Sequence, residues 1–503
     1  MRASSRRARR SDRAVPAAPA YVTRAIPYFA YLHEEGLARL EDQADWLIQE
    51  VGLEFREDPE ALRIWREAGA DVAGTRVRLP RGMARDLCRT APTRFVQHAR
   101  NPARSVRIGE DSVVFAPVYG PPFVRDLEGG RRYGAIADLE MLVKLTYSLP
   151  ALHHSGLMTC EPCDLPVNKR HLDALYAHMR WSDKPMLGAI TAKERAEDCV
   201  AMARILFGDD FSADKCVIMG NVNTNSPLLV DKVVTEAIRT YSAAGQGMIV
   251  APFILGGAMG PVTTAASIAQ ALAEAMMCCA FSQLVRPGAP FILGNFLSSM
   301  SLRSGAPTFG MPEPVSSNYI IGQLARRLGV PLRCGGSLTA SKVADAQAAA
   351  ESADSMHSTV MGGANFILHA AGWLEGGLVT GFEKLVIDAD RLGAYQKLLG
   401  GIEIDDNALG RSAYEDVEPA GHFLGSAHTM ANYETAYYDA ALSNSDSFEQ
   451  WQDAGSKDTE RRAHERWNKL LQDYQAPPID AATDEELQAF MAKRKAAMPD
   501  AWY

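Results

Sequence analysis

Residues 247–296 read GMIVAPFILGGAMGPVTTAASIAQALAEAMMCCAFSQLVRPGAPFILGNF, and this stretch decides the fold. It contains two short apolar runs, Gly247–Phe253 and Phe291–Phe296, separated by the helix-length segment Thr264–Val285. Apolar runs without polar alternation are typical of strands that are buried on both faces. A strand, a helix and a second strand in this order predict two parallel strands, because parallel neighbours need a crossover connection.

The same strand–helix unit recurs about eight times between Val113 and Gly401. Eight such units over roughly 290 residues fit a (β/α)8 TIM barrel, which is the α/β fold that we expect. An open, doubly wound sheet is the alternative, because the number of units does not exclude it. The predicted strands span 113–120, 153–160, 185–190, 215–222, 247–253, 291–296, 331–336 and 365–371, and the predicted helices span 138–148, 169–181, 193–207, 228–244, 264–285, 315–328, 344–361 and 378–399.

Further segments flank the predicted barrel, which we expect to occupy residues 111–401. Residues 21–110 combine helical apolar periodicity with a short strand around Arg76–Leu79, and this mixture predicts an N-terminal α/β cap. Residues 402–503 are more polar, and we expect them to form a C-terminal extension that wraps the barrel. Its predicted helices span 458–474 and 484–497.

The first twenty residues are rich in arginine and lack apolar periodicity, which favours a disordered tail. A transit peptide or a nucleic-acid-binding arm would look similar. The rest of the chain opposes a nucleic-acid partner, because the formal net charge is −9 and the pI is about 5.7.

Composition also indicates the cellular environment in which we expect the protein to fold. No run reaches the roughly 18 uninterrupted apolar residues of a membrane helix, so we expect no membrane segment. The eight cysteines lack the spacing of a disulfide framework, which predicts a reducing, cytoplasmic location. We also expect a homo-oligomer, in which Thr264–Val285 serves either as barrel core or as part of a subunit interface.

In a barrel of this kind the chemistry lies at the carboxyl ends of the strands. Aromatic, amide and glycine residues dominate these positions, whereas carboxylates and lysines are sparse. Rings without nearby carboxylates suit a quaternary ammonium group, which binds over ring faces by cation–π attraction. The alternative is that each ring only fills the core. The candidate rings are Tyr119, Phe123, Phe253, Phe309 and Trp373.

Cysteine and glycine motifs give weaker signals. Cys160 and Cys163 have the CxxC spacing of half a zinc site or of a redox pair, but no second pair completes a four-ligand site, so we expect no bound metal. Glycines at two strand ends are candidate contacts for a cofactor, although neither pair belongs to a GxGxxG or Walker motif. These glycines are Gly256, Gly257, Gly335 and Gly336.

Several ordered motifs between about Tyr133 and Trp467 resemble the trimethylamine methyltransferase family. They are GGAMGPVTTAASIAQALAE (256–274), RPGAPFILGNF (286–296), GMPEP (310–314), GVPLRCGGSLTASKVADAQAAAES (329–352) and GHFLGSAHT (421–429). The resemblance implies a (β/α)8 barrel that transfers a methyl group from a methylated amine to the cobalt of a separate corrinoid protein. The chain contains only standard residues and therefore resembles the branch without pyrrolysine, which includes glycine betaine methyltransferases.

The resemblance implies cob(I)alamin, converted to methylcobalamin, as the cofactor, supplied by a corrinoid protein that docks at the barrel mouth. Attack on an N-methyl group releases a neutral amine, so no residue is assigned as a general acid and the protein orients the substrate. If the substrate is glycine betaine, giving dimethylglycine, its carboxylate needs a donor, and Arg303 is the candidate. Asn295, His357 and His369 are candidates for further hydrogen bonds to substrate.

Other roles remain open at this stage. Asp345, Gln347 and Glu351 match a family motif and are expected to brace the site. His422 and His428 either lie near the barrel mouth or support it. The alternatives to glycine betaine demethylation are a binding protein without catalysis, a methyltransferase for carnitine, proline betaine or trimethylamine, and an aldolase or lyase that uses Lys342.

Overall fold

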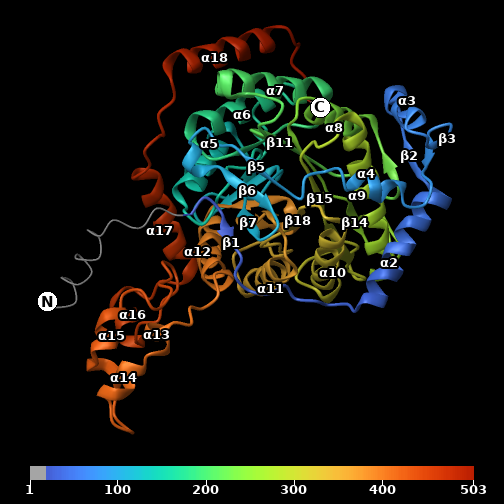
Figure 1. Cartoon of the computed structure of the whole chain (residues 1–503). Coiled ribbons are helices and arrows are strands. Elements are labelled where there is room, and N and C mark those ends of the chain that lie inside the picture. Colours follow the sequence, from blue (N-terminus) through green and yellow to red (C-terminus); the bar gives the residue numbers. More distant parts are fainter. Residues whose placement is uncertain (1–18, 503) are drawn as a thin grey trace.

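A curled, mostly parallel sheet forms the centre of the computed structural model, which describes residues 19–502 (Figure 1). Nearly all of the predicted N-terminal tail therefore lies outside the described residues. The sheet has the order β1-β7-β19-β18-β15-β13-β11-β10. Apart from β1, which is antiparallel to β7, neighbouring strands run parallel. The strands are β1 (Val22–Thr23), β7 (Ser112–Phe115), β10 (Met186–Gly188), β11 (Ile218–Val222), β13 (Gly247–Val250), β15 (Phe291–Gly294), β18 (Leu332–Gly335) and β19 (Phe366–Leu368).

The parallel strands follow one another in chain order, and the last of them, β19, pairs with the first, β7. A doubly wound sheet reverses its strand order, so that alternative does not describe this protein. Helices cover the outside of the curled sheet (Figure 1). They are α5 (Ile136–Ser148), α6 (Arg170–Trp181), α7 (Lys193–Phe207), α8 (Lys232–Ala243), α9 (Thr264–Val285), α10 (Pro312–Leu328), α11 (Ala346–Gly362) and α12 (Phe382–Leu399).

The strand predicted over 153–160 is absent as a regular strand. Its residues His153–Gly156 nevertheless lie between β7 and β10. The N–H of His153 donates to the carbonyl of Phe115 on one side, and the N–H of Leu187 donates to the carbonyl of Gly156 on the other. The N–H of Phe115 donates to His153 Nδ1 at 3.0 Å, where a regular ladder has a backbone carbonyl. The imidazole thus replaces part of the ladder, and this explains why the prediction of a strand was wrong.

Helix α9 is the longest apolar helix and forms part of the core. Among residues 19–502 it is the one helix long and apolar enough to cross a membrane, but 89% of its apolar window is buried inside the protein. Its Phe281 ring packs against Trp65 and Phe55 of the N-terminal region, with centroids 5.7 and 5.9 Å apart. Of the two roles expected for this segment, core packing is the one observed.

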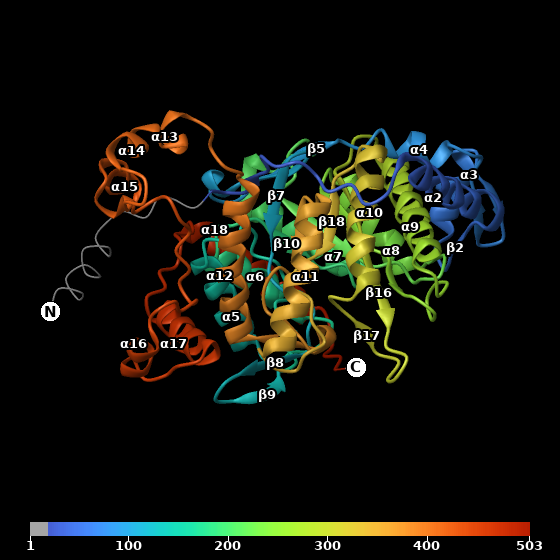
Figure 2. The same ribbon diagram turned by 90° about the horizontal axis from the view of Figure 1, so that it is seen from below.

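Short strands beyond the main sheet build the carboxyl end of the fold, and the sequence did not predict them. Strand β14 (Phe253–Leu255) pairs with β16 (Phe296–Met300), which forms a hairpin with β17 (Pro307–Thr308). A second small sheet has the order β20-β21-β8-β9. Both sheets project from the same end of the molecule (Figure 2). The strands of the second sheet are β8 (Phe123–Asp126), β9 (Gly130–Tyr133), β20 (Trp373–Leu374) and β21 (Val379–Gly381).

The N-terminal region forms a mixed α/β layer on one flank. Its sheet has the order β12-β2-β4-β3, and β12 (Leu229–Val230) comes from the loop before α8, so this layer is continuous with the main body. Helix α2 ends in a short π-helical turn, Leu47–Val51. The remaining elements are α2 (Glu34–Trp46), β2 (Leu53–Phe55), α3 (Pro59–Glu67), β3 (Asp71–Ala73), β4 (Arg76–Arg78), α4 (Met83–Cys88), β5 (Arg94–Gln97) and β6 (Val106–Gly109).

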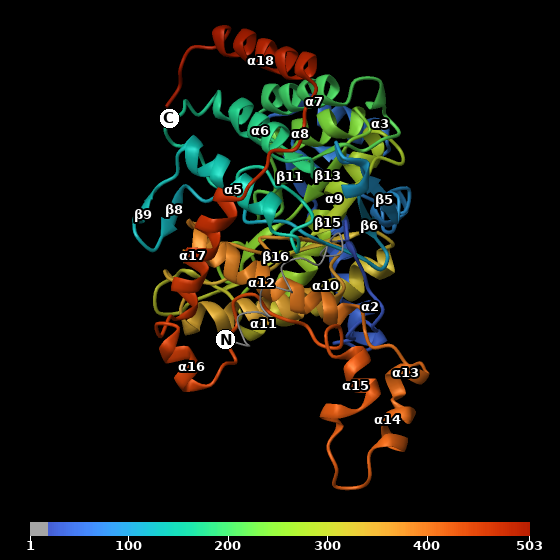
Figure 3. The same ribbon diagram turned by 90° about the vertical axis from the view of Figure 1, so that its left-hand side faces the viewer.

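The C-terminal region first projects from the body and then returns to it (Figures 2 and 3). Residues 402–438 form the projecting lobe with α13 (Asp406–Leu409), α14 (Arg411–Asp416) and α15 (Ala427–Asn432). After α16 (Phe448–Asp453), α17 (Thr459–Gln472) packs against α12 and α5, and α18 (Ala481–Ala496) packs against α7 and α6. Buried Glu383 of α12 accepts the indole N–H of Trp467 at 3.0 Å, which fixes α17.

Candidate functional site

Five aromatic side chains gather at the carboxyl end of the sheet, and we call them the aromatic cluster: Phe253, Phe296, Phe309, His369 and Trp373. The indole of Trp373 lies at the centre, with ring centroids 4.4 Å from His369, 5.7 Å from Phe309 and 6.0 Å from Phe296. Phe296 also contacts Phe253 at 5.0 Å, because the two residues pair in register at the starts of β14 and β16. The small outer strands thus bring together rings from distant parts of the sequence.

His369 follows β19 and is buried. Burial, assisted by the positive charge of Arg333, holds the pKa of this imidazole well below its ordinary value, so the ring is neutral at neutral pH. Its Nδ1 accepts the backbone N–H of Tyr119 at 3.2 Å. A neutral imidazole has one protonated nitrogen, so the proton is on Nε2. His369 also has a positive φ of 57°, a conformation that a non-glycine residue adopts at a cost in backbone strain.

Arg333 lies in β18 beneath the cluster and is only 1% exposed. Its Cζ is 5.1 Å from the centroid of Phe296, and its Nη1 donates to the backbone carbonyl of Asn295 at 3.2 Å. Within residues 19–502 no carboxylate forms an ion pair with this guanidinium. Burial lowers the pKa of Arg333 to about 10, so the side chain still carries its charge at neutral pH.

Several buried polar atoms near the strand ends have no hydrogen-bond partner in the described part of the chain. Buried polar groups are nearly always paired, so each such atom needs an explanation. Two of the residues concerned, Trp373 and Arg333, contact the same ring, that of Phe296. Their common location is consistent with a ligand site. The atoms are Arg333 Nε, Trp373 Nε1, Asn295 Oδ1 and Asn221 Oδ1.

Sequence reasoning missed Arg333 and Phe296. A charged residue in the middle of the apolar run PLRCGG was a usable signal, because lone charges are rarely fully buried without a function or a partner. Phe296 ends the predicted strand 291–296, and only its pairing with Phe253 shows that it reaches the cluster.

Three predicted site residues lie away from the cluster. Arg303 is exposed in the turn between β16 and β17, and His357 is exposed on α11, 3.4 Å from the hydroxyl of Tyr319. The ring of Phe123 is covered by the guanidinium of Arg131, whose Cζ is 3.5 Å from the ring centroid. All three side chains therefore lie outside the aromatic cluster.

Tyr119 and Asn295 border the cluster in different ways. Tyr119 touches it through the backbone bond to His369, and burial together with the Glu161 carboxylate raises the pKa of its hydroxyl. The amide of Asn295 donates to Ser317 and Asn318 of α10, so this side chain is turned toward the helix layer. The amide nitrogen of Asn295 is therefore used in contacts with α10, whereas its Oδ1 has no partner in the described residues.

The glycines predicted to contact a cofactor divide into two pairs. Gly335 and Gly336 are buried: a Cβ added to Gly335 would lie 2.6 Å from Leu338 Cδ1, and one added to Gly336 would lie 2.6 Å from Ala370 Cα. They permit close packing within the protein and offer no surface to a cofactor. Gly256 and Gly257 form the turn after β14, and Gly257 is exposed. Of the two glycine pairs, this turn is the one that reaches the protein surface.

The remaining candidates have structural contacts. Glu351 accepts from the hydroxyl of Thr339 at 2.6 Å and from Gln347 at 2.8 Å, and Asp345 caps α11 by accepting the N–H of Ala348, so these residues brace the loop after β18. Lys342 is exposed and donates to the carbonyl of Ala340 in its own loop. It therefore lacks the enclosed position of an aldolase lysine.

His422 and His428 belong to the projecting lobe, which lies at the opposite end of the molecule from β8, β9 and β17 (Figure 2). His428 bonds the carbonyl of Asn407 within that lobe, so neither histidine lies near the mouth. The thiols of Cys160 and Cys163 donate to backbone carbonyls, and burial raises the pKa of both. Over residues 19–502, no group of three or more His, Cys, Asp or Glu residues is arranged to hold a metal ion.

Comparison with known proteins identifies one family over nearly the whole chain. A family model described as trimethylamine methyltransferase matches residues 2–499. Glycine betaine methyltransferase of Desulfitobacterium hafniense is 36% identical, over 93% of this chain and 98% of that protein. Trimethylamine methyltransferase MttB of the same species is 25% identical, over 88% of this chain and 91% of that protein. Proline betaine:corrinoid methyltransferase of Eubacterium limosum is 25% identical, over 84% and 89% respectively.

Proposed function

This chain belongs to the trimethylamine methyltransferase family of corrinoid-dependent enzymes, and we propose that it takes its methyl group from glycine betaine and releases dimethylglycine. The observation that carries the proposal is the buried aromatic cluster at the strand ends. Trp373 lies in β20, Phe296 lies in β16, and Phe309 directly follows β17. A quaternary ammonium group offers no hydrogen bond, and such ring faces stabilise it by cation–π attraction. The 36% identical relative is named for the same substrate.

Methyl transfer requires the aromatic cluster to position the substrate, but it does not require proton transfer by a protein side chain. The corrinoid supplies the nucleophile when its carrier protein is docked. The docked corrinoid would accept the methyl group, and the electron pair of the broken C–N bond would stay on nitrogen, so dimethylglycine would depart without needing a proton at that nitrogen. The cluster therefore has to fix the direction of one C–N bond and exclude water. No residue is required as a general acid, in keeping with the neutral His369.

The corrinoid protein is proposed to dock at the end of the sheet that carries the β8–β9 and β16–β17 hairpins (Figure 2). The aromatic cluster lies at that end, and the exposed Gly257 belongs to a turn beside it. We further propose that His153–Gly156 closes the curled sheet into a full (β/α)8 barrel. Its backbone bonds to β7 and β10 support this closure. The eight unpaired cysteines support a cytoplasmic location.

An anaerobic assay tests the proposal. Purified protein is mixed with free cob(I)alamin and glycine betaine, the spectrum is followed for methylcobalamin, and dimethylglycine is measured. We expect both products, and no dimethylglycine when cob(I)alamin is omitted. Turnover with another methylated amine but not with betaine would retain the reaction and reject the substrate. Betaine binding without turnover in the presence of the cognate corrinoid protein would favour a binding protein.

A further inference from the structure

Resting on the proposed function, we propose that Arg333 binds the carboxylate of the substrate and selects zwitterionic betaines over methylated amines that carry only a positive charge. Arg303, the arginine expected from the sequence, is exposed in a hairpin turn. Arg333 is instead fully buried next to the aromatic cluster. The Arg333 side chain points inward, has no carboxylate counter-ion in the described residues and lies beside the proposed ammonium site.

The side chain of Arg333 points to the inner side of the sheet. Successive residues of a strand point to opposite faces. Its neighbour Cys334 lies beside the side chain of Asn295, which bonds Ser317 and Asn318 of the outer helix α10. Cys334 thus faces the helix layer, and Arg333 faces the interior. The charge of Arg333 also acts on buried His369, as expected for two groups on the same inner side.

The guanidinium has unused donors. The backbone carbonyl of Asn295 accepts one N–H, Nε has no partner, and nowhere in residues 19–502 does a carboxylate pair with this side chain. A buried charge without a counter-ion is strongly destabilising, so proteins rarely keep one without a function. A planar guanidinium with free N–H groups matches a carboxylate, which accepts two of them side by side. The substrate carboxylate would supply the missing counter-ion.

The two proposed subsites are adjacent. Arg333 Cζ lies 5.1 Å from the ring of Phe296, and that ring lies 6.0 Å from Trp373, so one side chain separates the guanidinium from the centre of the aromatic cluster. In glycine betaine a single methylene carbon joins the carboxylate to the ammonium group. One molecule of that shape fits a site whose cationic and aromatic parts share a wall.

The positive charge of Arg333 would make the site favour betaines over methylated amines that carry only a positive charge. A trimethylated amine without a carboxylate would enter next to an unpaired positive charge in a poorly screened interior, and the repulsion opposes binding. A betaine has no net charge and neutralises Arg333. The same site would therefore reject tetramethylammonium, even though both ligands present N-methyl groups to the rings.

The experiment compares Arg333→Met with Arg303→Met, which removes the same charge from an exposed turn. Binding of glycine betaine and of tetramethylammonium is measured by calorimetry, and betaine turnover is followed with cob(I)alamin. We expect Arg333→Met to weaken betaine binding about 30-fold or more and to tighten tetramethylammonium binding. Arg303→Met should bind both ligands like the parent protein. Arg333→Lys keeps the charge, so it should still reject tetramethylammonium while binding betaine less tightly.

The melting temperature of the ligand-free proteins separates a ligand role from a structural one. Because no carboxylate in the described residues pairs with the buried charge of Arg333, Arg333→Met should melt at the same temperature as the parent or higher. A clear fall, or a betaine affinity unchanged in Arg333→Met, would overturn the role of Arg333 while leaving the proposed function intact. If the parent protein neither binds nor demethylates betaine, the proposed function itself fails.

Discussion

Trp373 has an indole N–H that is buried and bonds nothing in the described residues, and its ring contacts three other members of the aromatic cluster. A tryptophan that only filled the core would usually find a partner for this N–H. Phe123 was an equal candidate from the sequence, but its ring already binds Arg131. The existing contacts of each ring thus decide whether that ring remains available for a substrate cation.

Replacement of Trp373 by leucine tests this distinction. Leucine keeps an apolar side chain but removes the ring quadrupole, so we expect the KM for glycine betaine to rise about tenfold. The measurement is steady-state demethylation with cob(I)alamin, with a thermal melt to establish that the variant is folded.

The matched control is Phe123→Leu, which removes a ring outside the aromatic cluster and should leave KM within about twofold of the parent value. Equal changes in the two folded variants would contradict the assignment of the ammonium site to Trp373.

The segment His153–Gly156 shows how one structural element can depend on buried imidazoles. His153 Nδ1 accepts the N–H of Phe115, and His178 of α6 bonds Ser155 Oγ and the carbonyl of Leu157. Burial lowers the pKa of His153 to about 3 and that of His178 to about 4. Both rings are therefore neutral in the folded protein at neutral pH.

Because these buried imidazoles must stay neutral in the folded protein, we expect the protein to lose stability in mild acid. The folded pKa of His178 lies below the ordinary value of 6.5, so the unfolded chain takes up a proton first. The stability that neutral His178 contributes to the folded protein is fully present above about pH 6.5 and is lost as the pH falls toward 4. We expect the free energy of unfolding in urea to fall between pH 7 and pH 5, with about 1–2 kcal/mol of that fall due to His178.

The variant His178→Gln cannot titrate. We expect it to be less stable than the parent at pH 7 but to lose less further stability at pH 5. His422→Gln, at an exposed position in the lobe, should keep the parental pH dependence. An identical pH slope in His178→Gln and the parent would argue against the role given to this histidine.

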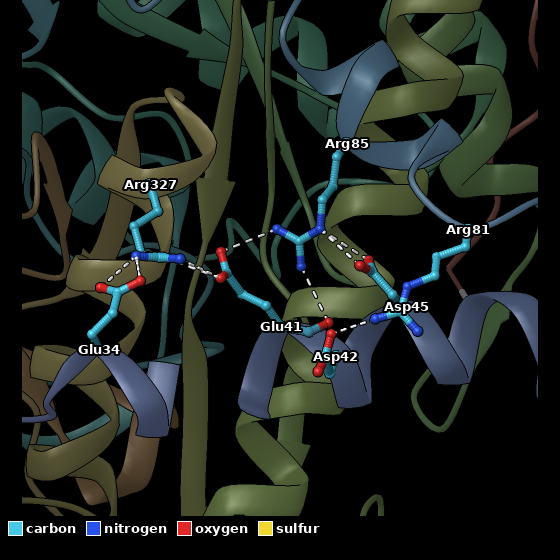
Figure 4. A network of polar contacts seen from close by, with 7 residues as sticks. All are labelled: Glu34, Glu41, Asp42, Asp45, Arg81, Arg85 and Arg327. Carbon is cyan, nitrogen blue, oxygen red and sulfur yellow. Dashed lines mark hydrogen bonds and ion pairs between the residues drawn. The ribbon is translucent and has the colours of Figure 1, made fainter. Parts of the chain in front are cut away.

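At the scale of the whole molecule, a charged network joins the N-terminal layer to the main body (Figure 4). Glu41 of α2 is its centre: one carboxylate oxygen accepts from Arg85 of α4 at 3.1 Å, and the other accepts from Arg327 of α10 at 2.7 Å. The Glu41 side chain is only 14% exposed, so solvent screens it less than a free surface charge. Networked, partly buried ion pairs of this kind contribute more to the free energy of unfolding than isolated surface ion pairs do.

We expect Glu41→Gln to lower the free energy of unfolding by about 1–2 kcal/mol, because the ion pairs with half-buried Arg85 and more exposed Arg327 both lose the negative charge. The control is Glu60→Gln, which breaks an exposed ion pair with Arg63 on α3 and should have no measurable effect. Urea unfolding of the two variants is compared with that of the parent. If Glu41→Gln were as stable as the control, the network would not couple the two layers.

Most regular elements could be predicted from the sequence, because their signals are local. The helices over 193–207 and 264–285 were predicted to the residue, since an apolar or amphipathic run of that length has few other conformations. The strand over 153–160 was predicted incorrectly, because side-chain hydrogen bonds override an apolar run and no local pattern reveals them. The short strands β14 and β16 were missed because they depend on pairing between distant segments.

The candidate site likewise has some features with local sequence signals and others that depend on contacts between distant segments. Contiguous residues carry the alternation of strand–helix units, the aromatic residues such as Trp373 that follow the strands, and the motifs of a methyltransferase family, so these features could be predicted. Two features became visible only in the folded chain: Phe296 joins the aromatic cluster, and Arg333, not Arg303, is the buried arginine without a counter-ion. Burial and charge pairing depend on which distant segments meet, and that is settled when the chain packs.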